Sequence, residues 1–427
     1  MRRRLLLPAL LLATLCCGAG ASEAQETEWT RRLALPPLLP TRDVITALPQ
    51  VQAARAGQDA ARARSQALDS GAYEWNLRAG AQERREDAGG RYLENEVALE
   101  RSIRWGGKAG TDRALGAAGQ TAARAGYADS WHEAVRGLLV NWYDWQRARS
   151  AAAVQGQQLA LAQEQLDVAT RRVRAGDVPR MDALMAEAER DRVQAQLQRA
   201  QEQEQVLRHE LQKRYPGLAL DAGTVAAADS APDALQLPGE PAQWVQRILD
   251  DNHEIERAEA ALRLARLRSE RTGLERQPDP LLGVRAARER GGAENIVGVY
   301  VGIPLTGSYR AAGERVALAE LAAAEQELLL TRQRVETAAQ RVVLRAGHAR
   351  AAWQRLAAVA QAMTHVAQLG MKAYGLGEMT LSEALQARRA ALEAVLAAEA
   401  ARWDALEATG RVLVDAHQLW AAEEGPH

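Results

Sequence analysis

Bulky aromatic side chains are scarce in this sequence of 427 residues: phenylalanine is absent, and aromatic residues make up only 4% of the chain. Hydrophobic residues reach 47%, but alanine supplies much of that share. A large compact core would use more bulky side chains, so the composition favours long helices packed side by side. The formal net charge is −1, which gives no electrostatic reason to expect a nucleic-acid partner.

Cysteine is almost absent as well, since Cys16 and Cys17 are the only two in the sequence. The remainder of the chain therefore offers no disulfide and no thiolate metal site. A lipid anchor on Cys17 is an alternative, but residues 14–16 match poorly the small-residue pattern that such lipidation requires.

Long apolar runs are also missing beyond the N-terminal segment, so no transmembrane helix is expected. The N-terminal segment itself has the pattern of a secretory signal peptide: arginines at 2–4, an apolar run at 5–16 and small residues at 19–21. The apolar run is short for a membrane-spanning anchor, so we expect residues 1–21 to be removed.

The most informative feature that is present is an internal duplication. Residues 102–107 (Ser-Ile-Arg-Trp-Gly-Gly) correspond to 302–307 (Gly-Ile-Pro-Leu-Thr-Gly), and residues 175–184 correspond to 376–385. A repeat of about 200 residues is too long for a solenoid and indicates two structural halves. The predicted organisation is a signal peptide at 1–21, a first structural repeat at 22–214, a linker or equatorial segment at 215–240, a second structural repeat at 241–420 and a C-terminal tail at 421–427.

Each half is predicted to contain a short helix, a β-hairpin and a long helical hairpin. Alternating side chains predict strands, and proline-free stretches with apolar residues three and four apart predict helices. The predicted strands are 73–84, 92–104, 280–288 and 294–304; the predicted helices are 41–70 (with a possible break at Pro49), 108–174, 179–214, 241–274, 310–374 and 380–419; residues 25–40 are predicted to be extended. The predicted seams of the two long helices are Leu159, Ala162, Leu166, Ala169 and Val173, and Leu328, Thr331, Val335, Ala338 and Val342.

The predicted strands have one apolar face and one polar or glycine-rich face. Four strands are too few to close a barrel wide enough for a channel. The helices have alanine-rich seams suited to packing on each other, so the apolar strand faces must meet lipid or another subunit. A closed barrel shared between subunits would satisfy the backbone hydrogen bonds in lipid, and aromatic residues near the strand ends suit its interfacial girdles. The alternative is a small soluble sandwich.

Together these features resemble the TolC-type outer-membrane efflux proteins. The resemblance covers residues 41–415 and depends on the duplication, on the strand-end pair at 103–108 and 303–307, and on the tip pair at 176–182 and 377–383. Segments 104–108 and 252–265 look most like the CzcC-like heavy-metal branch. The resemblance implies a mainly α protein with a membrane β-barrel portion. Three subunits would contribute four strands each to a twelve-stranded barrel in the outer membrane, and the duplicated long α-helical hairpins would form a periplasmic α-barrel tunnel of roughly 100 Å.

The resemblance also assigns candidate site residues. The barrel-to-tunnel junction would contain Trp105, Gly106, Gly107, Pro304 and Gly307. The periplasmic tip, with its gate and adaptor contacts, would contain Gly176, Asp177, Val178, Met181, Asp182, Gly377, Glu378, Met379, Ser382 and Glu383. Glu94, Glu96 and Glu100 share one strand face and would make a cation-tolerant barrel lumen, or else a solvated strand face.

Several tip residues also have a simpler structural interpretation. Gly176 and Gly377 are expected helix C-caps, and Thr380 with Glu383 forms a predicted capping box. Asp182 and Glu383 would either compensate a helix dipole or form rings of three carboxylates that favour cations. If the second interpretation holds, neutralising Glu383 should alter conductance or adaptor docking.

No enzyme, metal site or cofactor is predicted. No Ser/His/Asp order, phosphate loop or paired catalytic carboxylates stand out, and the seven histidines have no paired ligand spacing. The leading hypothesis is a passive exit duct that works with a periplasmic adaptor and an inner-membrane pump, of the resistance-nodulation-division type if heavy-metal cations are exported. Alternatives are a duct for organic compounds or type I secretion, a periplasmic coiled-coil adaptor without a barrel, and a metal-binding periplasmic protein.

Overall fold

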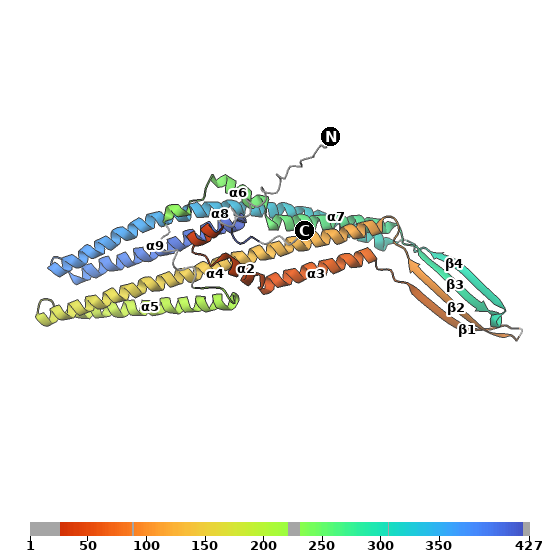
Figure 1. Ribbon diagram of the computed structural model, residues 1–427, viewed down its shortest axis with the longest axis horizontal. Coiled ribbons are helices and arrows are strands. Elements are labelled where there is room, and N and C mark those ends of the chain that lie inside the picture. Colours follow the sequence, from red (N-terminus) through yellow and green to blue (C-terminus); the bar gives the residue numbers. More distant parts are fainter. Residues whose placement is uncertain (1–25, 88, 221–230, 306, 422–427) are drawn as a thin grey trace, which may run out of the picture. The chain divides into compact units, whose positions relative to one another are not determined.

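The computed structural model describes residues 26–87, 89–220, 231–305 and 307–421 (Figure 1). The predicted signal peptide, both cysteines and most of the predicted C-terminal tail lie outside these residues. The elements are α2 (Leu38–Thr46), α3 (Pro49–Ser70), β1 (Asn76–Arg85), β2 (Arg91–Ser102), α4 (Lys108–Ala175), α5 (Arg180–Arg214), the 3-10 turn η2 (Pro232–Leu235), α6 (Pro241–Asp250), α7 (His253–Gly273), the 3-10 turn η3 (Leu274–Arg276), β3 (Leu281–Glu289), the 3-10 turn η4 (Arg290–Gly292), β4 (Glu294–Gly302), α8 (Ser308–Leu376) and α9 (Leu381–Asp415).

The predicted hairpins and long helical hairpins are confirmed to within a few residues, but two predictions of local structure are wrong. Residues 26–32 are helical rather than extended, because Trp29 and Leu33 lie four residues apart and are both buried. The break predicted at Pro49 in the helix at 41–70 is confirmed: α2 and α3 are separated before Pro49, which lacks the amide hydrogen that a continuous helix would use. The helix predicted at 241–274 is also two helices, α6 and α7, interrupted at residues 251–252.

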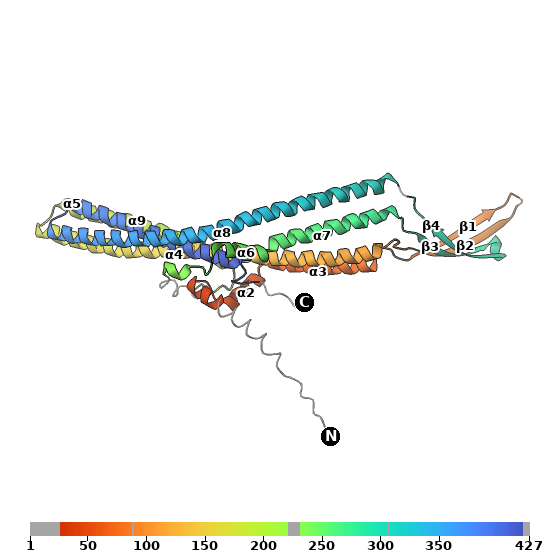
Figure 2. The ribbon, with the colours of Figure 1, turned by 90° about the horizontal axis from the view of Figure 1, so that it is seen from above.

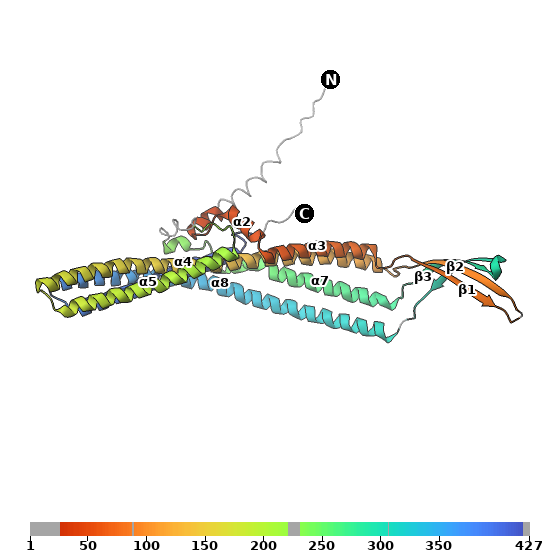
Figure 3. The same ribbon diagram turned by 90° about the horizontal axis from the view of Figure 1, so that it is seen from below.

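The chain forms two compact units. One unit contains residues 53–129 and 253–334, which include the sheet, α3, α7 and the first parts of α4 and α8. In this unit α3 lies beside α4 and α7 beside α8 (Figure 3). The contact between α3 and α4 is close, since a Cβ on Gly116 would lie 2.5 Å from Oγ of Ser65. The short helix α3 therefore packs on α4, the long helix of its own repeat.

The sheet is antiparallel, with strand order β1-β2-β3-β4. Its register places Leu99 opposite Leu77 and Val284, and Val284 opposite Val299. One face of the sheet is thus apolar and the other polar, as the alternation predicts. The apolar face is open: Val299 is 83% exposed and Val297 is 86% exposed in the single chain.

The other unit contains the remaining parts of α4 and α8 together with α2, α5, α6 and α9. The turns between α4 and α5 and between α8 and α9 lie at the same end of this unit (Figures 1 and 2). Its core contains fully buried Trp142 and Tyr143, whose polar atoms donate to the backbone oxygens of Ala34 and Leu33 at 2.9 and 2.7 Å. The N-terminal segment therefore completes the core around α4.

Small residues at heptad spacing form the helix seams, but the predicted seam of α8 is only partly right. Leu328, Thr331 and Val335 are buried, whereas Ala338 and Val342 are half-buried. The buried positions shift by one residue because an α-helix has 3.6 rather than 3.5 residues per turn. They then continue at intervals of seven, as Ala339, Ala346, Trp353, Ala360, Ala367 and Tyr374. On α4, Ala162 and Ala169 are buried, while Leu159, Leu166 and Val173 are half-buried.

None of the described helices combines the length and the hydrophobicity that a membrane-spanning helix requires.

Candidate functional sites

The two helical turns at the tip have the same backbone geometry. Gly176 and Gly377 adopt φ of 76° and 80°, in the left-handed region that favours glycine. After each helix the glycine amide donates to the carbonyl three residues back, at 3.1 Å. The next amide, of Asp177 or Glu378, donates to the carbonyl five residues back, at 3.0 and 2.9 Å. This pattern is the Schellman motif, so the prediction that both glycines are C-caps is confirmed.

The helices that follow these turns start differently. On α9 the predicted capping box is present: the Glu383 amide donates to the Thr380 hydroxyl at 3.3 Å, and the Glu383 carboxylate accepts from the Thr380 amide at 2.9 Å. The hydrogen bonds from the Thr380 hydroxyl and amide lower the pKa of Glu383. On α5, Pro179 precedes the helix without a side-chain cap, and Asp182 lies in the first turn.

Asp182 is bound instead by a residue that sequence analysis missed. The Tyr374 hydroxyl, from the end of α8, donates to Oδ2 of Asp182 at 2.9 Å. Arg172 lies over the Tyr374 ring at 5.1 Å and donates to its carbonyl oxygen at 3.2 Å. Burial, followed by the bond to Asp182, raises the pKa of Tyr374 to about 12. The tip of the first hairpin is thereby linked to the tip of the second.

Around this link lies a small apolar cluster. Tyr374 is 5% exposed and is buried together with Ala169, Ala186, Leu381, Ala384 and Leu385. Met379, one of the predicted tip residues, is partly buried against the cluster. Sequence analysis missed Tyr374 because the seam that it predicted on α8 continues to residue 373, one residue away from the buried series that contains Tyr374.

A second link between the repeats lies further along the same helices. Glu189 is buried and accepts from Arg389 at 2.6 Å and from Arg192 at 2.5 Å. Burial raises the pKa of Glu189, but the hydrogen bonds from the two arginines outweigh this effect and lower it. Sequence analysis missed this cluster, whose members Glu189 and Arg389 lie 200 residues apart in the sequence.

The structure leaves most of the predicted tip residues on the surface and brings few of them together. Asp182, Val178 and Met379 are half-buried. The remainder are exposed, namely Gly176, Asp177, Met181, Gly377, Glu378, Ser382 and Glu383. An exposed tip is available for contacts with another molecule, whereas Asp182 already has a partner within the chain.

At the strand-to-helix junction of the first repeat, Lys108 is completely buried. Its ammonium group donates to the Gln277 carbonyl oxygen at 2.7 Å and to Oδ1 of Asp279 at 2.9 Å. The Trp105 amide donates to the same Asp279 oxygen at 2.8 Å, and the Tyr73 hydroxyl donates to the other at 2.7 Å. This junction cluster (Tyr73, Trp105, Lys108, Gln277 and Asp279) connects the two repeats beneath the sheet. Sequence analysis selected Trp105 but missed Asp279.

The junction glycines fit this arrangement. Gly106 and Gly107 have φ of 70° and 88°. A Cβ on Gly106 would lie 2.3 Å from the Gln277 side chain, whereas one on Gly107 would meet nothing within 4 Å. The second junction is different: next to Pro304, Leu305 is 95% exposed, and a Cβ on Gly307 would also meet nothing within 4 Å.

On the polar sheet face, two of the three predicted glutamates are paired. Glu100 accepts from Arg78 at 2.7 Å and from the Tyr300 hydroxyl at 2.5 Å. Glu94 forms an ion pair with Arg84 at 3.0 Å. Glu96 is half-buried opposite Gly80 and Ala287. The face is therefore a network of both charge signs rather than a row of free carboxylates.

Among the described residues, no group of three or more histidine, cysteine, aspartate or glutamate side chains is arranged to hold a metal ion.

Comparison with solved structures shows which fold this is. The outer membrane channel CmeC of Campylobacter jejuni matches with a TM-score of 0.71 and 13% identity, covering 94% of this chain and 87% of CmeC. The outer membrane protein VceC of Vibrio cholerae matches with a TM-score of 0.70 and 16% identity, covering 94% and 98%. The outer membrane channel MtrE of Neisseria gonorrhoeae, in its open state, matches with a TM-score of 0.69 and 16% identity, covering 93% and 91%.

This chain has the fold of those outer membrane proteins over nearly its whole length. No protein-family model and no curated protein matches it.

Proposed function

We propose that this chain is the outer-membrane exit duct of a tripartite efflux system. The observation that carries the proposal is the similarity of the fold to outer membrane channels over 94% of the chain. A second observation supports it: the apolar sheet face is open to its surroundings, with Val299 83% exposed. Exposure of so continuous an apolar face favours contact with lipid.

The proposed assembly is a homotrimer in which each subunit contributes its four strands to one twelve-stranded barrel. In the part of the chain that the structure describes, the outer edges of β1 and β4 have no strand partner. An unpaired edge in lipid would leave backbone groups unsatisfied, so pairing β4 of one copy with β1 of the next is favoured. The polar face, with Glu94, Glu96 and Glu100, then lines the lumen.

The proposed gate is the tip of the two helical hairpins. The bond between Tyr374 and Asp182 holds the tips of both repeats together, so its loss would allow the hairpins to separate. The exposed residues Asp177, Met181, Glu378 and Ser382 are proposed to contact the periplasmic adaptor.

A passive duct has no energy source of its own and needs no catalytic site or cofactor. An inner-membrane pump would therefore supply the energy for export. The proposed substrates are heavy-metal cations, and support for this class is the resemblance of residues 104–108 and 252–265 to the heavy-metal branch. Organic-compound efflux and type I secretion use ducts of the same kind and remain the alternatives for the substrate.

The decisive experiment is to measure the oligomer size and heat-modifiability of the protein extracted from purified outer membranes. We expect a detergent-stable trimer that conducts ions in planar bilayers. A soluble periplasmic monomer would overturn the proposal and favour the adaptor hypothesis instead.

A further inference from the structure

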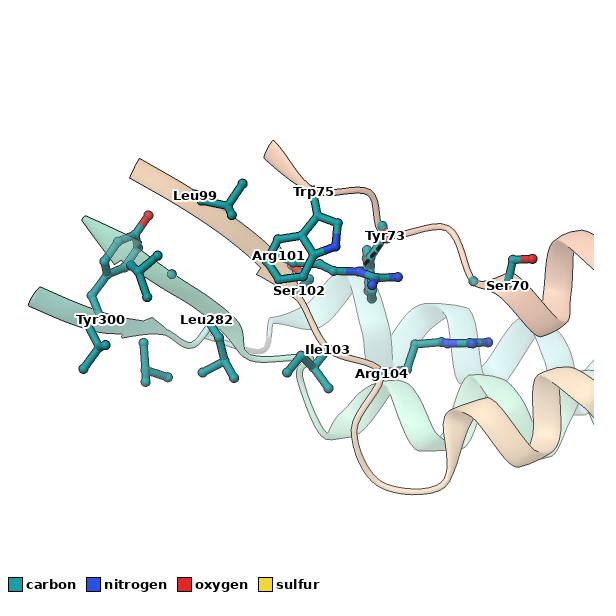
Figure 4. Close-up of a pocket in the computed structure, with 15 residues that line it drawn as sticks. Ser70, Tyr73, Trp75, Leu99, Arg101, Ser102, Ile103, Arg104, Leu282 and Tyr300 are labelled. Carbon is teal, nitrogen blue, oxygen red and sulfur yellow. Dashed lines mark hydrogen bonds between the residues drawn. The ribbon is translucent and has the colours of Figure 1, made fainter. Parts of the chain in front are cut away.

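A groove of about 660 Å³ lies where the apolar face of the sheet approaches the end of α3 (Figure 4). Most of the residues that line it belong to β2, β3 and β4. The aliphatic residues of this lining are Leu99, Ile103, Leu282, Val284, Val299 and Val301. A groove of this kind suits an alkyl chain.

Arg101 interrupts the aliphatic part of the lining. Arg101 lies between Leu99 and Ile103 on the same face of β2, and the register places it opposite Leu282. Its Nε donates to the Tyr73 carbonyl oxygen at 2.9 Å, and its guanidinium lies 5.6 Å from the centre of the Trp75 ring (Figure 4). Among the described residues, no carboxylate lies within ion-pairing distance of Arg101.

The other arginines nearby are already paired. Arg104, which also lines the groove, donates to the carbonyl oxygens of Leu68 and Asp69 and to the Asp112 carboxylate. On the opposite face of the sheet, Arg78 pairs with Glu100. The structure thus provides carboxylates for these arginines but none for Arg101.

A guanidinium on a lipid-facing surface is unfavourable unless an anion or water reaches it. Its planar fork of donors matches the oxygens of a phosphate group. Trp75, which is 63% exposed beside it, has the amphipathic ring that is typical of the membrane–water interface.

We propose that this groove binds an anionic phospholipid. The phosphate contacts Arg101 next to Trp75, and an acyl chain lies against Leu99, Val284 and Val299. The inference rests on the proposed function, because it requires the apolar face to meet lipid. It adds a site of defined lipid chemistry at the end of the strands nearest the junction.

The test uses the detergent-purified full-length protein and native mass spectrometry to measure binding of phosphatidylglycerol and of phosphatidylcholine with the same acyl chains. We expect phosphatidylglycerol to bind more tightly, and Arg101→Gln to weaken its binding about tenfold, the effect of one charge-assisted hydrogen bond. Arg288→Gln is the matched control, because Arg288 is exposed on the same sheet face but does not line the groove.

Arg101→Lys keeps the charge but removes the planar fork, so it should bind phosphatidylglycerol with intermediate affinity. Equal binding by the wild type and Arg101→Gln, or equal loss in Arg288→Gln, would overturn the inference. The inference would also be overturned if inorganic phosphate displaced phosphatidylglycerol and the site bound both equally well, because the site would then be one for a free anion.

Oligomer size and heat-modifiability are recorded on the same samples before lipid is added. A trimer whose lipid binding does not depend on Arg101 would overturn this inference alone. A soluble monomer would instead overturn the proposed function.

Discussion

At the scale of single residues, two buried polar side chains join the repeats. Lys108 is completely buried against Asp279, 171 residues away in sequence. Tyr374 is buried against Asp182, 192 residues away. Both side chains link segments from different halves of the duplication. Replacing either one should therefore destabilise the folded protein more than replacing an exposed lysine or tyrosine.

Replacing Lys108 with Met should destabilise the unit that contains the sheet by about 3–5 kcal/mol, because the Asp279 carboxylate would remain buried without its cation. The measurement is the temperature at which the heat-modifiable form is lost. Lys372→Met removes an exposed lysine and should have no measurable effect. Equal effects of the two substitutions would show that the ion pair contributes little.

The same ion pair predicts a dependence on acid. Burial raises the pKa of Asp279, but hydrogen bonds from the Trp105 amide, Tyr73 and Lys108 outweigh this effect and lower it below the ordinary value. A carboxyl group whose pKa is lower in the folded than in the unfolded state stabilises the folded protein. This stabilisation is complete above the pKa of the unfolded state, about 3.9, and is lost as the pH falls through the pKa of the folded state. Lys108→Met should therefore show a weaker loss of stability in acid than the wild type.

Replacing Tyr374 with Phe removes the bond to Asp182 and should weaken the link between the two hairpin tips, the proposed gate, by about 0.5–1.5 kcal/mol. We expect a higher open probability in planar bilayers. Tyr309→Phe alters an exposed tyrosine and is the matched control. If Tyr374→Phe leaves the open probability unchanged, the bond between Tyr374 and Asp182 does not contribute to gating.

Alkaline pH offers a second test of that bond. The pKa of Tyr374 is raised from 10.0 to about 12, so its stabilising effect is complete below the unfolded value and is lost as the pH rises through the folded value. Wild-type conductance should rise between these limits, whereas Tyr374→Phe should not respond.

At the scale of elements, the sequence predicts those parts that local chemistry determines. Glycines at 176 and 377 end helices because few other residues adopt their φ values, and alternation identifies the four strands. The junction cluster could not be predicted from the sequence, because Lys108 lies close to Asp279 only when β2 and β3 pair in one particular register. The helix at residues 26–32 is missed because its stability comes from burial of Trp29 rather than from a recognisable start signal.

Substitutions of Glu383 at the start of α9 can distinguish two roles that the sequence leaves open, helix capping and a charge at the tip. Glu383→Gln keeps an N3 side chain that can accept the backbone hydrogen bond, whereas Glu383→Ala loses the capping box and about 1 kcal/mol of stability. If the charge matters at the tip, Glu383→Gln should alter conductance or adaptor docking with little change in stability. Normal transport and docking in Glu383→Gln, with destabilisation only in Glu383→Ala, would limit Glu383 to capping.

At the scale of the whole molecule, a substitution on the open apolar face tests whether the protein forms the proposed membrane assembly. Val299→Lys should reduce the yield of the heat-stable trimer in outer membranes, because a lysine facing lipid costs about 2–4 kcal/mol. Ile296→Lys, on the opposite face of the same strand, is the control. If the protein were instead soluble, Val299 would face water at 83% exposure, and Val299→Lys would change the free energy of unfolding by no more than about 0.5 kcal/mol.

The order of the strands also has a genetic consequence. In the described part of the chain, β1 and β4 each have one unpaired edge, so a ring in which β4 of one copy pairs with β1 of the next closes only if every copy is competent. When half of the copies in a cell carry a defective edge strand, only about one ring in eight would consist entirely of normal copies. Edge-strand alleles should therefore be dominant over the wild type, whereas a simple deletion of the gene should be recessive.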